Sequence, residues 1–150
     1  MTDTEKPIPD DEWRTIVANV PLVSVDLVIE HNGGVLLGKR ENEPAKGEWF
    51  VLGGTVFKNE SRTDAVHRVA EEELGESVVV DDCLGTSEHV YETAETDGVD
   101  SKHYLATGYR CHFERTDPEL GADEQHSGFQ LFRPPFEGLH PYVQRYLDDW

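Results

Sequence analysis

The segment from Ser61 to Gly75 places the strongest constraint on the fold, because both of its ends carry signals of a helix terminus. Ser61 and Asp64 have the S-x-x-D spacing of a capping box. Gly75 can adopt the left-handed conformation that closes a helix. Between these ends an apolar stripe recurs at helical spacing, formed by Ala65, Val66, Val69, Ala70 and Leu74. The sequence therefore predicts an amphipathic helix over residues 61–74, with one face against a core.

Segments with the composition of β-strands flank this helix on both sides. Residues 22–29 and 35–37 surround the turn signal Asn32-Gly33-Gly34 and predict a β-hairpin. Residues 49–52 predict a short strand that stops at Gly53-Gly54, where two glycines let the backbone turn sharply and expose its carbonyls. Later strands are expected at residues 77–80, 84–91, 103–113 and 129–132.

Two shorter helices complete the expected order of elements. Apolar residues recur at helical spacing within residues 10–19, and a final amphipathic helix follows Pro141. Together these elements predict an α/β fold with a central mixed sheet flanked by helices. The sequence has 150 residues and no obvious linker, so we expect one domain over residues 1–150, with a flexible start at residues 1–10.

The charge balance excludes several classes of function. Asp and Glu number 31 against 13 Lys and Arg, which gives a formal net charge of −18. This charge would repel nucleic acid and anionic lipid surfaces, so we expect neither as a partner. The acidic residues are spread along the whole chain and lysine is scarce, a composition typical of proteins adapted to concentrated salt. An acidic protein from a non-halophilic source is the alternative.

Cysteine usage and the first residues indicate the compartment. Cys83 and Cys111 are widely spaced and form no C-x-x-C motif, so we expect two core thiols and neither a disulfide framework nor a zinc site. Residues 1–10 are polar and acidic, and no apolar run is long enough to cross a bilayer. These features predict a cytoplasmic protein.

The last turn of the predicted helix over residues 61–74 concentrates negative charge. Glu71, Glu72 and Glu73 lie beside the negative pole of the helix dipole, which costs stability unless a cation offsets it. A solvated acidic helix end is the alternative explanation. Glu73 follows Val69 by four residues and shares the apolar side of the helix, so its carboxylate should point inward. Next to the carbonyls of Gly53-Gly54 it would form an oxygen-rich pocket suited to Mg²⁺.

These residues also belong to a longer pattern. Gly54 is followed after five residues by Glu60 and, after seven more, by the run Arg68-Val69-Ala70-Glu71-Glu72-Glu73-Leu74-Gly75. The spacing resembles the Nudix box, whose usual form is G-x5-E-x7-R-E-U-x-E-E-x-G-U with U apolar, and a motif of this length is specific. The resemblance implies the Nudix fold, an α/β/α sandwich, and divalent-metal-dependent hydrolysis of a nucleoside-diphosphate derivative.

Two positions depart from the box. Val69 stands where Nudix enzymes normally have a glutamate, and Glu76 follows the box glycine where an apolar residue is usual. The missing glutamate is a metal ligand or a base in Nudix enzymes that attack phosphorus. The wider sequence resembles one branch that lacks the same glutamate, the GDP-mannose mannosyl hydrolases, which break the bond between sugar C1 and the diphosphate. This likeness covers roughly residues 20–135 and rests on residues 21–26, 37–40, 44–51, 103–104 and 123–126.

The resemblance implies a metal site and a base. Mg²⁺, or Mn²⁺ in its place, would be bound by the Gly53 carbonyl, Glu73 and Gln125, with Glu72 as a further metal-binding candidate. His126 would be the catalytic base that activates water. A histidine in a loop is more often a surface residue, and its place in the family pattern is what singles it out.

The resemblance also implies a set of substrate contacts. Arg40 would meet the diphosphate and neutralise the leaving group, and Asp26 and Tyr104 would hold the substrate together with His89. From the residues alone, Asp26 in a predicted strand has two explanations, a solvated face or a ligand-facing carboxylate. Thr55 occupies a position where the branch usually has an arginine, so one contact to phosphate is missing unless another cation replaces it.

Three functions remain open on the sequence. The first is hydrolysis of a GDP-sugar, GDP-mannose or GDP-glucose, to GDP and free sugar by water attack at C1. The second is a Nudix pyrophosphatase that attacks phosphorus, which Thr55 and the retained Glu72 favour. The third is a module that binds a nucleotide sugar without turnover. The resembled branch forms dimers, and the resemblance therefore implies a homodimer.

Overall fold

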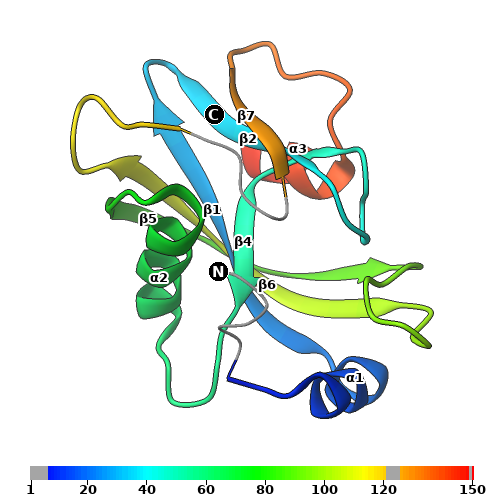
Figure 1. The fold of residues 1–150 in the computed structure, drawn as a ribbon. Coiled ribbons are helices and arrows are strands. Elements are labelled where there is room, and N and C mark those ends of the chain that lie inside the picture. The colour runs from blue at the N-terminus through cyan, green and yellow to red at the C-terminus, as the bar shows by residue number, and fades with distance from the viewer. Residues whose placement is uncertain (1–6, 121–125, 149) are drawn as a thin grey trace.

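The computed structural model describes residues 7–120, 126–148 and 150, and within them a sheet is flanked by helices (Figure 1). Residues 1–6 of the expected flexible start and the predicted metal ligand Gln125 lie outside the described residues. The expected α/β architecture is confirmed. The elements are α1 (Asp10–Asn19), β1 (Leu22–His31), β2 (Gly34–Arg40), β3 (Trp49–Phe50), β4 (Leu52–Thr55), α2 (Arg62–Leu74), β5 (Val78–Tyr91), β6 (Lys102–Phe113), β7 (His126–Phe132) and α3 (Pro141–Leu147).

The described strands form one mixed seven-stranded sheet. The main path runs β3-β2-β1-β6-β5, with β4 also paired to β1 and β7 also paired to β2. Strands β1 and β6 run parallel, whereas the other pairings are antiparallel. Because β1 pairs with β2, β4 and β6, it lies at the centre of the fold.

The turn between β1 and β2 has the conformation that its sequence predicts. Asn32 has φ 47° and Gly33 has φ 78°, both in the left-handed region that a tight two-residue hairpin turn requires. Glu30 then pairs with Val35, and His31 with Gly34. The predicted hairpin is therefore confirmed, because its turn is determined by residues adjacent in the sequence.

Alternation along β1 separates two layers of the core. Val25, Leu27 and Ile29 are fully buried in a cluster with the apolar face of α2. Val28 points the other way, into a cluster that includes Val143 of α3. The period-two alternation of a strand thus places α2 and α3 on opposite faces of the sheet (Figure 1). Helix α1 packs at the end of the sheet where β1 begins.

Helix α2 begins and ends as its sequence predicts. The Ser61 hydroxyl accepts a hydrogen bond from the backbone N–H of Asp64 at 3.1 Å. Gly75 closes the helix with φ 68°, and its N–H donates to the Glu71 carbonyl at 2.9 Å. Glu73 is 8% exposed, so its carboxylate points inward as expected. Helix α2 thereby carries a charged side chain into the interior next to β4.

The expectation of a sharp turn at Gly53-Gly54 is wrong, because both residues lie within β4 and pair with β1. Both positions require glycine because side chains of neighbouring elements approach the β4 backbone closely. A Cβ on Gly53 would lie 2.6 Å from Oδ1 of Asp26, and one on Gly54 would lie 2.7 Å from Cγ2 of Val69. The absence of side chains lets β4 fit between Asp26 on one neighbour and α2 on the other.

Two further expectations need correction. The strands predicted at 77–80 and 84–91 form a single strand, β5, because register shifts at Val80/Asp82 and Cys83/Gly85 absorb the irregular stretch between them. Cys83 is exposed on that strand, whereas Cys111 is buried, so only one of the two expected core thiols is in the core. Among the described residues no helix is long and apolar enough to cross a bilayer.

Candidate active site

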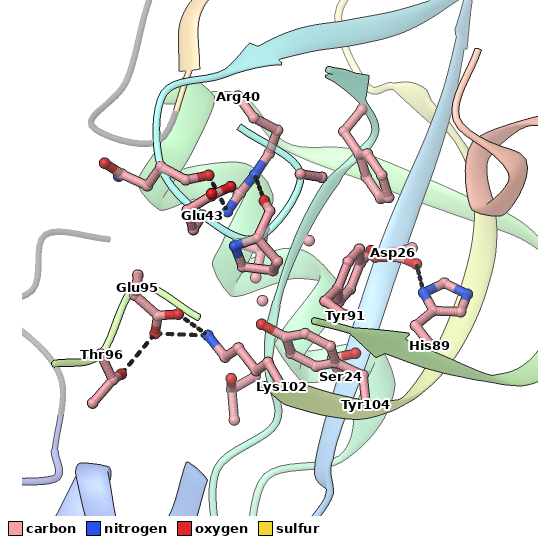
Figure 2. A pocket seen from close by; sticks show the side chains of 18 of the residues that line it. Ser24, Asp26, Arg40, Glu43, His89, Tyr91, Glu95, Thr96, Lys102 and Tyr104 are labelled. Atoms are coloured by element: carbon pink, nitrogen blue, oxygen red, sulfur yellow. Dashed lines mark hydrogen bonds and ion pairs between the residues drawn. The ribbon is translucent and has the colours of Figure 1, made fainter. Parts of the chain in front are cut away.

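A pocket of about 390 Å³ extends from α1 to α2 along β1, β4 and β6. It brings together seven of the nine site residues predicted from the sequence, namely Asp26, Arg40, Gly53, Glu72, Glu73, His89 and Tyr104. His126 is not among the residues that line it, and Gln125 lies outside the described part of the chain. Figure 2 shows the two ends of this pocket, with Asp26 and His89 at one side and Glu95 and Lys102 at the other.

Arg68 organises the part of the pocket next to α2. Its guanidinium donates to both carboxylate oxygens of Glu60, at 2.7 and 3.1 Å, and to the Thr55 carbonyl at 2.7 Å. A further bond at 3.2 Å holds Glu72 one helical turn away. The hydrogen bonds from Arg68 hold the pKa of Glu60 below its usual value. Arg68 therefore fixes Glu72 in place, which is the role its spacing along the helix predicts.

Oxygen atoms gather where α2 meets β4. Glu72, Glu73 and Gly53 all line the pocket, and Glu73 is nearly buried. Among the described residues no group of three or more His, Cys, Asp or Glu side chains could hold a metal ion. The available donors are thus two carboxylates and a backbone carbonyl, which fit an ion such as Mg²⁺ that binds hard oxygen ligands and retains several waters. Gln125 would be a further oxygen donor, outside the described residues.

Val69 occupies the wall between these carboxylates and β4. Its side chain is 2% exposed and packs directly over Gly54. It lines the pocket, so a carboxylate at this position would face the same space as Glu72 and Glu73. The hydrocarbon side chain can neither bind a metal ion nor accept a proton. The departure from the Nudix box therefore falls inside the site.

Asp26 is a buried carboxyl at one end of the pocket. It is 8% exposed, lies on the face of β1 opposite α2, and accepts a hydrogen bond of 2.6 Å from the hydroxyl of Tyr146 in α3. Burial raises the pKa of Asp26 to about 6, against the opposing effects of the Tyr146 hydrogen bond and the Arg40 charge. Of the two explanations that the sequence allowed for Asp26, the structure supports the ligand-facing carboxylate.

His89 lies beside Asp26 and is held by the same helix. Its ring stacks on Tyr142 with centroids 4.1 Å apart and planes 4° apart, and its Nδ1 lies 3.9 Å from Oδ2 of Asp26. Burial, together with the charges of Arg145 and His140, lowers the pKa of His89 to about 4. The imidazole is therefore neutral at pH 7. Its buried Nε2 has no hydrogen-bond partner among the described residues, so it can bond a ligand in the pocket.

Arg40 reaches the pocket from the end of β2. Its guanidinium donates to the backbone carbonyls of Pro44 at 3.3 Å and Asn42 at 3.4 Å, so the loop after β2 holds it (Figure 2). Burial raises the pKa of both Asp26 and Tyr104, and the charge of Arg40 opposes that rise in each case, so Arg40 interacts electrostatically with both groups. A guanidinium in this position suits the binding of a phosphate group.

Tyr104 and Tyr91 form an aromatic wall between the two ends of the pocket. Their rings meet edge to face with centroids 6.0 Å apart. Burial raises the pKa of each phenol far above its usual value, and nearby carboxylates add to the effect. Both hydroxyls therefore stay protonated and can donate hydrogen bonds to a substrate.

His126 occupies a different position from the other predicted residues. It begins β7, pairs with Arg40 of β2, and is 1% exposed. Its ring lies against Gly38, where a Cβ would clash with it, and 5.3 Å from the ring of Phe129. The structure thus places the imidazole next to the strand that carries Arg40 but inside the packing of β2 and β7. Its role as the base stays a prediction.

Sequence reasoning missed several residues that line or support the pocket. These are Ser24, Tyr91, Glu95, Lys102 and Tyr146. A signal existed for two of them, because Ser24 and Asp26 share a face of β1 by strand alternation, as do Lys102 and Tyr104 on β6. Tyr146 had no such signal, since its contact with Asp26 spans 120 residues of sequence.

Comparison with known protein families and sequences agrees with this geometry. The model of the NUDIX domain matches residues 20–144. The low-salt glycan biosynthesis protein Agl8 of Haloferax volcanii is 66% identical over 141 residues, which cover 94% of this chain and 89% of that protein. An ADP-ribose pyrophosphatase of Methanocaldococcus jannaschii is 39% identical over 77 residues, covering 51% of this chain and 43% of that protein.

Solved structures show the same fold. The MutT NUDIX hydrolase from Burkholderia pseudomallei superposes with a TM-score of 0.65 at 27% identity, covering 85% of this chain and 96% of that one. The MutT protein from Methanosarcina mazei gives a TM-score of 0.67 at 22% identity, covering 86% and 92% of the two chains. The second likeness shows the fold alone.

Proposed function

Since the chain belongs to the Nudix hydrolase family, we propose that it hydrolyses a GDP-sugar, GDP-mannose or GDP-glucose, to GDP and free sugar by water attack at sugar C1. The observation that carries this proposal is Val69, an apolar side chain in the pocket wall where Nudix enzymes that attack phosphorus have a glutamate. Attack at carbon needs no carboxylate at that position. The glycan role in the name of the Haloferax volcanii relative also favours a sugar-containing substrate.

The reaction would be a single displacement. The water oxygen bonds to C1, the bond from C1 to the β-phosphate oxygen breaks, and the leaving GDP keeps the electron pair. No covalent nucleophile takes part, so the configuration at C1 inverts. We assign the water proton to His126, because imidazole is the most common general base in enzymes. His126 would act from β7, next to Arg40.

The charge of the leaving diphosphate determines the remaining roles. The Gly53 carbonyl, Glu73, Glu72 and Gln125 would hold Mg²⁺ or Mn²⁺, whose positive charge would stabilise the leaving group. Arg40 binds the diphosphate from the opposite wall. Arg40, Gly53, Glu72 and Glu73 all line the pocket. Asp26, His89 and Tyr104 would then hold the sugar and the nucleoside on either side of the diphosphate.

The second candidate is a pyrophosphatase that cleaves a nucleoside-diphosphate derivative by attack at phosphorus. Glu72 favours it, because this carboxylate lines the pocket and is oriented by Arg68 at 3.2 Å. The partial similarity to an ADP-ribose pyrophosphatase points the same way. Both candidates use the same pocket and metal site, and they differ in the atom that water attacks.

Isotope labelling separates the two candidates. Purified protein is incubated with GDP-mannose and Mg²⁺ in concentrated KCl and H₂¹⁸O, and the products are analysed by mass spectrometry. We expect the label in free mannose and none in GDP, with proton NMR showing inversion at C1. GMP and mannose phosphate with label on phosphorus would refute attack at carbon and establish the second candidate.

A further inference from the structure

The end of the pocket next to α1 contains a group of side chains of which only Tyr104 has a role in the proposed function. They are Trp13 of α1, Glu95 and Thr96 of the loop between β5 and β6, and Lys102 and Tyr104 of β6. Figure 2 shows Glu95, Thr96 and Lys102 on the far side of the two tyrosines from Asp26 and His89. This group, the α1-side cluster, forms a second polar region in the same cavity.

The α1-side cluster is built into the fold by several contacts. The Arg14 guanidinium of α1 donates to the Asp97 carbonyl at 3.0 Å, which ties the loop over residues 92–101 to the helix. Val99 of the same loop packs with the apolar side of α1, in a small core that contains Trp13 and Val17. The loop is thus held against α1, and Glu95 is held at the pocket.

An ion pair lies at the centre of the α1-side cluster. The Lys102 ammonium bonds both carboxylate oxygens of Glu95 at 2.7 Å, with the lysine side chain 7% and the glutamate side chain 34% exposed. Burial opposes ionisation of the carboxyl, but the Lys102 charge holds the pKa of Glu95 below its usual value. An ion pair with one partner this exposed contributes little net stability. Recognition of a ligand is a better reason for it to face a pocket.

The ion pair presents a strong donor and a strong acceptor side by side. An ammonium offers three protons, and a carboxylate has about four acceptor positions. Aromatic surface surrounds them, because the Lys102 ammonium lies 5.7 Å from the ring centroid of Trp13 and 5.2 Å from that of Tyr104. A flat ligand whose edge carries N–H groups next to a carbonyl matches both features.

We propose that the α1-side cluster is a nucleobase subsite that selects guanine. The N1–H and the 2-amino group of guanine would donate to the Glu95 carboxylate, the Lys102 ammonium would donate to O6, and the Tyr104 ring would contact the base face. Guanine satisfies three hydrogen bonds here. Adenine presents one donor next to one acceptor, and uracil presents one donor between two acceptors, so each base makes two of these bonds. Hypoxanthine also makes two, because it lacks the 2-amino group.

The orientation of the bound substrate in the pocket follows from the proposed function, on which this inference rests. Attack at C1 with His126 as base requires the sugar near the β2–β7 side, where Arg40 pairs with His126. With the diphosphate at Arg40 and the proposed metal ligands, the nucleoside would extend away from β7, to the side of Tyr91 and Tyr104 where Glu95 and Lys102 lie (Figure 2). The base therefore reaches the region next to α1.

Binding measured without turnover tests the subsite. Calorimetric titration with Mg²⁺ compares GDP, IDP, ADP and UDP on the wild-type protein and on Glu95→Gln. We expect the wild-type protein to bind GDP roughly tenfold more tightly than IDP, ADP or UDP, and Glu95→Gln to lose roughly tenfold in GDP affinity with little change for UDP. Glu92→Gln, an exposed position in the same loop, should bind all four ligands as the wild-type protein does.

The ratio of GDP to UDP affinity is the decisive readout, because a folding defect would weaken both ligands equally. An unchanged ratio in Glu95→Gln would overturn the assignment of the base, and so would equal affinity of the wild-type protein for all four nucleotides. The labelling experiment is independent of this result. Guanine selectivity combined with label on phosphorus would support the subsite while refuting attack at carbon.

Discussion

Replacing Asp26 with asparagine should stabilise the metal-free protein at neutral pH. The Asp26 carboxyl is buried and its pKa is raised from 3.8 to about 6, so its ionised form destabilises the folded state. A rise of that size corresponds to a penalty of about 3 kcal/mol well above pH 6. Asparagine has nearly the same shape, can still accept the Tyr146 hydrogen bond and carries no charge, so Asp26→Asn removes the penalty.

The pH dependence gives the prediction its sign. The raised pKa of Asp26 contributes stability that is fully present below 3.8 and is lost as the pH rises through about 6. Asp26→Asn should therefore exceed the wild-type protein by about 3 kcal/mol near pH 8, by about 1.5 kcal/mol near pH 5 and by about 0.5 kcal/mol near pH 4. For a domain of this size the difference near pH 8 equals about 6 to 12 °C in Tm.

The assay is thermal and denaturant unfolding of both proteins in concentrated KCl with EDTA, across this pH range. Asp100→Asn, an exposed position in the loop before β6, serves as the control and should change stability little at any pH. A stability difference for Asp26→Asn that does not vary with pH, or a loss of stability near pH 8, would refute the reasoning from burial. The same variant should lose activity because it lacks the pocket carboxyl.

Three further changes test other parts of the site. Glu73→Gln should lower metal-stimulated turnover by roughly a hundredfold or more while preserving Tm, because a proposed metal ligand is lost. Turnover equal to that of the wild-type protein at saturating Mg²⁺ would contradict the assignment of Glu73 as a metal ligand. Arg68→Ala should reduce both Tm and turnover, since Glu60, Glu72 and the Thr55 carbonyl all lose their hydrogen-bond donor. Arg62→Ala, on the same helix, is the control. Equal losses of Tm and turnover in the two variants would disprove the role of Arg68 in organising the pocket. Gly108→Ala should cost about 1–3 kcal/mol in unfolding experiments, because the new methyl group would clash with the Tyr146 ring; an unchanged Tm would show that α3 packs more loosely.

Local signals account for the parts of the fold that the sequence predicts well. Helix α2 matches its expected range within one residue, because Ser61 and Gly75 act on their own neighbours. The β1–β2 hairpin follows from Asn32 and Gly33 in the same way. The inward direction of Glu73 follows from its spacing to Val69. In each case the determining residues lie within a few positions of the structure they specify.

Long-range packing accounts for what sequence reasoning missed. Gly53 and Gly54 were expected to make a turn, yet they are glycines because Asp26 and Val69 approach β4 from other elements. The Lys102–Glu95 ion pair faces Trp13 only because α1 docks across the loop between β5 and β6. No local pattern indicates such neighbours.

The bond between Asp26 and Tyr146 also bears on when the site becomes complete during synthesis. Strand β1 leaves the ribosome early, but the helix that bonds Asp26 and stacks on His89 is the last element in the described chain. A nascent chain that has formed the sheet and α2 still lacks Tyr142 and Tyr146. Its pocket would contain the proposed metal ligands of α2 and β4 but would lack the contacts that support Asp26 and His89. Catalytic competence is therefore acquired only after α3 has been synthesised and docks on the sheet.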